Sequence, residues 1–232
     1  MSRSESRFRI LSCRRCGSCC RSNPPALHGS DRDHYLQSWL VRQHLITFRQ
    51  GEVVYDNVLD KVQPLDQELV RIRSRPGSTA CIFYDYGQRA CRIYAHRPLE
   101  CRVFACWDPQ GIFSAYARDR IQRLDLISAR SALGEIIREH EKMCSWARVM
   151  DVLPEEDHAP DADQTRELAR ILDADHGMRH GLRTQAGASE AELDFILGRD
   201  MAAVLSSLGL RVHHAGSGYR FGVKRAVAGE RW

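Results

Sequence analysis

Hydrophobic and polar positions repeat along the chain with two periods, and each period predicts a different kind of element. Residues 69–73 (LVRIR) alternate apolar and basic side chains, which predicts a half-exposed strand. From residue 119 to about 149, apolar side chains recur every three or four positions, which predicts one long helix or two joined helices. The apolar stripe of this helix comprises Ile121, Leu124, Ile127, Leu133, Ile136 and Ile137. We expect it to cover a small sheet.

Two further patterns add a helix and a hairpin to the first half of the chain. Residues 30–45 predict a helix with Ser30 as its N-cap and acidic residues in its first turn. Its expected buried face comprises Leu36, Trp39, Leu40 and Leu45. Residues 81–85 and 91–94 predict two short strands that flank a turn at 86–88 and bring Cys81 and Cys91 to neighbouring ends of a hairpin.

The composition changes between residues 151 and 162, where acidic residues and two prolines occur without any Lys or Arg. This segment predicts a linker. We therefore expect a domain over 1–150 and a small appendage over 163–232, with helices at about 163–174 and 189–208 and a hairpin turned at Gly216, Ser217 and Gly218. Together these elements predict an α+β protein.

Charge and hydropathy exclude several classes of protein. No stretch approaches the 18 apolar residues of a membrane-spanning helix, and residues 1–12 lack the apolar core of a secretory signal, so we expect a cytoplasmic protein without a membrane partner. A net charge of +4 is too small to indicate a nucleic-acid partner. The predicted hairpin is basic at Arg211, Arg220, Lys224 and Arg225, but the helix before it is acidic, so we expect a packing or dimerisation element there.

The chain contains nine cysteines, and eight of them lie in two short windows. Because a cytoplasmic compartment keeps thiols reduced, this clustering indicates metal binding and not disulfides. The predicted ligands are Cys13, Cys16, Cys19, Cys20, Cys81, Cys91, Cys101 and Cys106. The ninth, Cys144, follows Ile137 by seven residues on the apolar stripe, so we expect it in the core.

Thiolates are soft ligands that suit zinc, copper(I) and iron–sulfur clusters. The CxxCxxC spacing of Cys13, Cys16 and Cys19 is the one that holds three corners of a [4Fe–4S] cubane in bacterial ferredoxins, whereas a zinc ribbon would add a second close CxxC pair. An iron–sulfur cluster is therefore the preferred cofactor and zinc the alternative. Adjacent side chains leave the backbone in different directions, so we expect Cys20 to serve a different metal position from Cys19.

The segments CRRCGSCC (13–20), CIFY (81–84) and CRIYAHRPLECRVFAC (91–106) resemble the YkgJ-type cysteine cluster proteins, a family described as a zinc- or iron-chelating domain. The resemblance implies a small bacterial metal-binding module, often assigned as an iron–sulfur oxidoreductase. A looser similarity extends to the flagellin lysine-N-methylases. Residues 160–232 lie outside the resemblance.

Three functions remain open from the sequence. The first is an iron–sulfur protein that transfers electrons to a redox or protein partner, which the sequence does not identify. The second is a structural zinc-binding interaction module. The third is a methylase-like enzyme that uses S-adenosylmethionine. No catalytic residue can be named, since the chain has no GxGxxG, Walker or GxSxG motif. We interpret His176 and His180 as a solvated helix end interrupted by Gly177 and Gly181. A site that needs both His213 and His214 is not expected, because neighbours on a strand face opposite ways.

Overall fold

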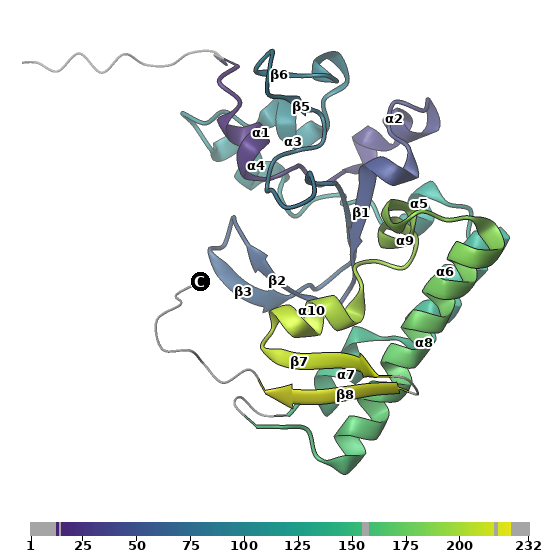
Figure 1. Ribbon diagram of the computed structural model, residues 1–232. Coiled ribbons are helices and arrows are strands. Elements are labelled where there is room, and N and C mark those ends of the chain that lie inside the picture. The colour runs from purple at the N-terminus through teal and green to yellow at the C-terminus, as the bar shows by residue number, and fades with distance from the viewer. Residues whose placement is uncertain (1–12, 14, 155–157, 216–217, 224–232) are drawn as a thin grey trace, which may run out of the picture.

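The computed structural model describes residues 13, 15–154, 158–215 and 218–223, and it is a mixture of helices and small antiparallel sheets (Figure 1). This confirms the α+β class. Each sheet has two strands: β1 (Leu45–Phe48) with β4 (Leu69–Ile72), β2 (Val53–Asp56) with β3 (Lys61–Pro64), β5 (Tyr84–Asp85) with β6 (Ala90–Cys91), and β7 (Leu210–Ala215) with β8 (Gly218–Val223).

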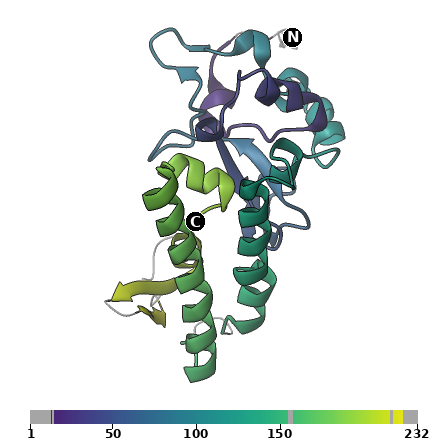
Figure 2. The same ribbon diagram turned by 90° about the vertical axis from the view of Figure 1, so that its right-hand side faces the viewer.

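The helices divide between two ends of the molecule (Figure 1). Around the β5–β6 hairpin lie the short helices α1 (Ser18–Ser22), α3 (Leu99–Val103) and α4 (Gln110–Ala115), while α2 (Arg32–Leu36) lies near β1. The other end contains α6 (Ala132–Met143), α7 (Trp146–Val152), α8 (Ala162–Ala186) and α10 (Met201–Ser207); α5 (Arg123–Leu126) and α9 (Glu190–Ile196) lie between the two ends. Figure 2 shows α6 and α8 as two long helices standing side by side. None of the described helices is long and apolar enough to cross a bilayer.

The predicted strand at 69–73 is confirmed as β4. Its Val70 and Ile72 are buried, and β1 places Leu45 and Thr47 on the same side, with Leu45 opposite Ile72 in the antiparallel register. The alternation of apolar and basic residues along β4 therefore reflects a sheet with one face packed against the core.

The helix predicted over 30–45 is wrong beyond Leu36, and Ser30 is not its N-cap. Ser30 lies inside a short 3₁₀ helix, Gly29–Asp31, and Asp31 precedes α2. Ser38 adopts a left-handed φ of 64°, which ends the helix, and Leu36 and Trp39 are 58% and 46% exposed. Only Leu40 and Leu45 of the expected apolar face are buried. Leu45 begins β1, so pairing with a strand more than twenty residues away overrides a local helical pattern.

The region 119–149 forms three helices, α5, α6 and α7, in place of one or two. Ile121 bonds in an extended segment between Leu27 and Val70: its N–H donates to Leu27 and its carbonyl accepts from Val70. Leu124 is 37% exposed, and Ser131 begins α6 as an N-cap whose hydroxyl accepts from the N–H of Gly134.

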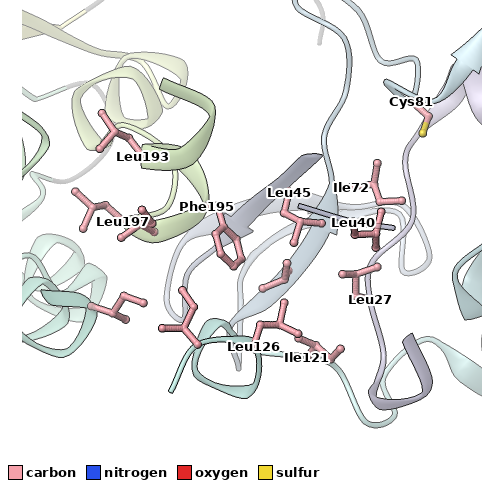
Figure 3. Close-up of a cluster of buried hydrophobic side chains, with 14 of the residues drawn as sticks. Leu27, Leu40, Leu45, Ile72, Cys81, Ile121, Leu126, Leu193, Phe195 and Leu197 are labelled. Atoms are coloured by element: carbon pink, nitrogen blue, oxygen red, sulfur yellow. The ribbon is translucent and has the colours of Figure 1, made fainter. Parts of the chain in front are cut away.

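Two buried clusters hold these elements together. The first surrounds β1 and β4, and Figure 3 shows Phe195 of the C-terminal part beside Leu45, with Leu197 on the far side of Phe195. The hydroxyl of Thr47 also donates to the carbonyl of Phe195 at 2.7 Å. The second cluster joins Trp146 to apolar residues of α8 and α10. Residues after 163 therefore contribute to the same core as residues before 150; the boundary at 151–162 stays a prediction, and 155–157 lie outside the described residues.

The C-terminal helices differ from their predicted bounds. Helix α8 runs through Gly177 and Gly181 without interruption, and the stretch 189–208 divides into α9 and α10 at Gly198, whose φ is 79°. The predicted hairpin is confirmed as β7–β8, with His213 opposite Arg220 and His214 opposite Tyr219. Its turn residues Gly216 and Ser217, and Lys224 and Arg225 beyond it, lie outside the described residues.

Candidate metal centre

The two cysteine windows meet at one end of the core. The N–H of Cys81 donates to the carbonyl of Cys20 at 2.7 Å, which joins α1 to the segment before β5. Cys91 lies opposite Tyr84 in the β5–β6 pair, and the N–H of Tyr84 donates to the carbonyl of Cys81. Cys81 lies at the edge of the first buried cluster (Figure 3). The backbone thus brings Cys20, Cys81 and Cys91 together. The hairpin is shorter than predicted, since its strands cover 84–85 and 90–91 instead of 81–85 and 91–94, and Cys81 lies before β5.

Cys101 joins this group from helix α3. The start of α3 is fixed by the N–H of Leu99, which donates to the Asp31 carboxylate at 2.8 Å, and by Glu100, which accepts from the N–H of Ala26 at 2.8 Å. Burial raises the pKa of the Cys101 thiol, and the thiols of Cys81, Cys19 and Cys91 raise it further. Cys101 therefore lies within electrostatic reach of the other window.

The expectation that Cys19 and Cys20 point apart is wrong. Their sulfur atoms lie 4.0 Å from each other. Hydrogen bonding to Cys20 lowers the pKa of Cys19 to about 6, and the same contact, together with burial, raises the pKa of Cys20. Two thiolates that share a tetrahedral ion at about 2.3 Å lie about 3.8 Å apart, so this pair is spaced as two ligands of one metal atom would be.

Five thiols gather here, and the exposed Cys16 lies within electrostatic reach of one of them, Cys19. Burial raises the pKa of Cys81 to about 11 and also raises that of Cys91, as expected for apolar surroundings. Cys13, Cys16 and Cys106 are exposed. The N–H of Arg15 donates to the Cys13 sulfur at 3.4 Å, and the Cys16 thiol donates to the Ser18 hydroxyl at 3.3 Å. Among the described residues, no three potential ligands already surround one ion position.

A tyrosine between two arginines connects the windows. The guanidinium of Arg97 lies 3.6 Å from the centre of the Tyr94 ring, and that of Arg15 lies 4.3 Å from it. Arg15 belongs to the first window and the other two residues to the second. The charge of Arg97 helps to lower the pKa of Cys19 and opposes the rise that burial causes in the pKa of Cys91.

Two of the other arginines near the cysteines, Arg92 and Arg102, bond to the protein itself. Arg92 donates to the carbonyl of Ile82, and Arg102 donates to the carbonyl of Arg97 and reaches Asp31. A further contact between the windows carries no signature in the sequence: the Thr79 hydroxyl donates to the carbonyl of Arg21 at 2.7 Å. Arg14 lies outside the described residues.

The ninth cysteine lies apart from this group, as expected. Cys144 is fully buried in the second cluster, and its thiol points at the carbonyl of Ile171 at 3.6 Å. Burial raises its pKa to about 12. A neutral, enclosed thiol of this kind behaves as a small hydrophobic side chain.

Comparison with known proteins gives one match. A family model named CxxCxxCC and described as "Putative zinc- or iron-chelating domain" matches residues 12–145, which include all eight clustered cysteines. No curated protein and no solved structure matches the chain.

Proposed function

The chain belongs to the CxxCxxCC family of zinc- or iron-chelating domains, and from this membership we propose that it is a cytoplasmic iron–sulfur protein that transfers electrons. Metal binding follows from the family; the identity of the metal and the redox role are the proposal. When bound, the cluster would supply a reversible one-electron centre. The chain's own residues would bind the cluster, shield it from water and offset the charge of its thiolate ligands.

The convergence of five thiols from both windows carries this proposal. Four thiolates complete either common iron–sulfur cluster, and four also complete a zinc site, so five converging thiols are enough for one metal centre of either kind. Each iron of a [2Fe–2S] cluster takes two thiolates, whereas each iron of a cubane takes one. The 4.0 Å between the sulfurs of Cys19 and Cys20 therefore favours two ligands of one iron in a [2Fe–2S] cluster.

The surroundings support a redox role. Cys81 and Cys91 pack against the apolar core, which excludes water from one side, whereas Cys19 of the same group is exposed. An exposed edge would let electrons pass to a partner protein, and Arg97 would offset the negative charge of the thiolates. No acid or base from the protein is required for electron transfer.

Zinc is the second candidate, and one observation favours it. The spacing of the Cys19 and Cys20 sulfurs equally suits a tetrahedral Zn²⁺ completed by two of the neighbouring thiols, in a module that organises an interaction surface. The methylase-like alternative ranks third, because the sequence lacks a glycine-rich nucleotide loop.

Elemental analysis separates the candidates. The chain is purified without oxygen, and iron, acid-labile sulfide and zinc are measured per chain together with the visible spectrum. We expect equal amounts of iron and sulfide and a spectrum that bleaches on reduction with dithionite. Stoichiometric zinc in a colourless protein without sulfide would contradict the iron–sulfur proposal and support the zinc module.

A further inference from the structure

Three histidines that belong to two separate sequence motifs meet on the surface of the C-terminal part. The rings of His176 and His214 stack with their centres 5.0 Å apart and their planes at 20°. The His180 ring lies 6.5 Å from that of His176 at 11°. All three side chains are exposed. This group lies outside the residues matched by the family and shares no residue with the cysteine centre.

The helix and the hairpin place these side chains on facing surfaces. His176 and His180 are four residues apart on α8, which continues through both glycines, so they share one helix face. The β7–β8 hairpin lies against α8 (Figure 2). Alternation along β7 turns His214 toward α8 and His213 to the opposite side. The Tyr219 ring, opposite His214 in the register, supports it edge-on at 4.8 Å.

A carboxylate completes the set of donors. Asp173 precedes His176 by three residues and therefore lies on the same face of α8. One of its oxygens lies 4.0 Å from the position that a Cβ would take at Gly218, at the start of β8. Imidazole nitrogens joined by a carboxylate oxygen form a ligand set suited to zinc and similar divalent ions.

We propose that His176, His180 and His214, with Asp173, form a second metal site for a divalent ion such as Zn²⁺ or Co²⁺. Two imidazoles on one tetrahedral ion, with metal–nitrogen distances of about 2.0–2.1 Å, place their ring centres about 5 Å apart, which is the observed separation of His176 and His214. The histidine rings are stacked on one another, so among the described residues no three potential ligands already point at one ion position. Binding therefore rotates the rings about their side-chain bonds, which their exposure permits. The bound ion would tie the hairpin to α8.

Cobalt titration tests this site in the whole chain. The protein is purified without oxygen so that the cysteine centre keeps its own metal, and Co²⁺ is then added. We expect one further equivalent to bind with weak visible bands and without the intense near-ultraviolet absorption of cobalt–thiolate bonds. His176→Ala and His214→Ala should each lower this affinity roughly tenfold or more, since even indirect partners of a metal ligand are worth about that much.

His213→Ala provides the matched control, because it removes a neighbouring exposed imidazole from the other side of the same strand. Its affinity for Co²⁺ should stay within about twofold of that of the parent chain. Circular dichroism melts verify that each variant is folded. The site is refuted if no further Co²⁺ binds, if the added Co²⁺ shows only thiolate absorption, or if His214→Ala binds as tightly as His213→Ala.

Discussion

Gly17 lies directly against the phenol ring of Tyr84. The glycine has a left-handed φ of 76°, and a Cβ built on it would lie 2.5 Å from Cζ of the tyrosine. Gly17 stands between Cys16 and Cys19 of CxxCxxCC, and Tyr84 ends the CIFY segment of the second window. The contact therefore sets how closely the two ligand windows approach.

Gly17→Ala should weaken both folding and metal binding. The positive φ costs about 1 kcal/mol, and displacing the Tyr84 ring adds about 1–3 kcal/mol. Urea unfolding of the reduced, metal-free chain gives the loss of stability, and metal per chain gives the effect on the centre. Gly77→Ala is the control, since Gly77 has a φ of 66° but open space around it. Equal losses in the two variants would show that the Tyr84 contact is unimportant.

Replacing Tyr94 should loosen the connection between the two windows. In Tyr94→Leu, Arg15 and Arg97 both lose the ring on which they lie, and each such contact is worth about 0.5–2 kcal/mol. We expect metal to leave the protein several times faster when a chelator is added.

Tyr55→Leu is the control for Tyr94. Tyr55 is 54% exposed on β2, and its hydroxyl donates to Asp60 of the same hairpin, outside both cysteine windows. Its release of metal to the chelator should match that of the parent chain. If both variants release metal at the parent rate, Tyr94 does not hold the windows together.

Glu141 makes the free energy of unfolding depend on pH under acidic conditions. Burial alone would raise its pKa, but hydrogen bonds and charge attraction from Arg49 and Arg123 lower it to about 2, from an ordinary value of 4.5. A lowered pKa in the folded state stabilises the fold fully above about pH 4.5, and this contribution is lost as the pH falls toward 2. Urea unfolding between pH 6 and pH 2.5 should show this decline.

Glu141→Gln should flatten that decline and lower stability at pH 7. Arg49 is completely buried and loses its ionised partner, keeping the carbonyl of Cys144 and a bond to the one remaining oxygen at position 141. We expect a loss of about 2–3 kcal/mol, below the usual cost of breaking a buried pair because the Glu141 side chain is 35% exposed. Glu139→Gln, on the same helix and bonded only to exposed Lys142, should change stability by under about 0.5 kcal/mol. A parallel pH profile in Glu141→Gln and the parent chain would contradict the assignment.

Local patterns predicted the elements whose neighbours in space are also neighbours in sequence. The β5–β6 and β7–β8 hairpins were foreseen because a turn and two flanking strands lie in one short segment. The sequence pattern predicts a helix up to Leu45, where the structure has the start of β1, because Leu40 and Leu45 also fit the apolar face of a helix. Its strand character depends on β4, which only the folded chain brings beside it.

The identity of the candidate ligands could be predicted, but their grouping could not. Thiolate chemistry and clustering are visible in any cysteine-rich window. The position of Cys101, by contrast, depends on Asp31 and Ala26, which bond to α3 from 68 and 74 residues away in sequence. The same holds for His214, which meets His176 only because the hairpin folds onto α8.

The last prediction concerns whether Cys19 and Cys20 hold the same metal atom. Their sulfurs are 4.0 Å apart, so each single replacement, Cys19→Ser or Cys20→Ser, should remove the same fraction of the metal. The double variant should then lose no more than either single variant, because the shared position is already lost. Metal and sulfide per chain, measured after anaerobic purification, give these fractions.

Cys16→Ser tests the alternative in which the positions are separate. Cys16 is exposed and lies in the CxxCxxC spacing with Cys19, whereas Cys20 packs against the core. If Cys19 and Cys20 serve different metal atoms, Cys20→Ser and Cys16→Ser should remove different fractions of the metal. The double variant of Cys19 and Cys20 should then lose as much metal as the two single variants lose together. Because Ser preserves the size of the side chain and these positions are at least partly exposed, the variants should fold. Additive losses in the Cys19 and Cys20 double variant would therefore overturn the shared position.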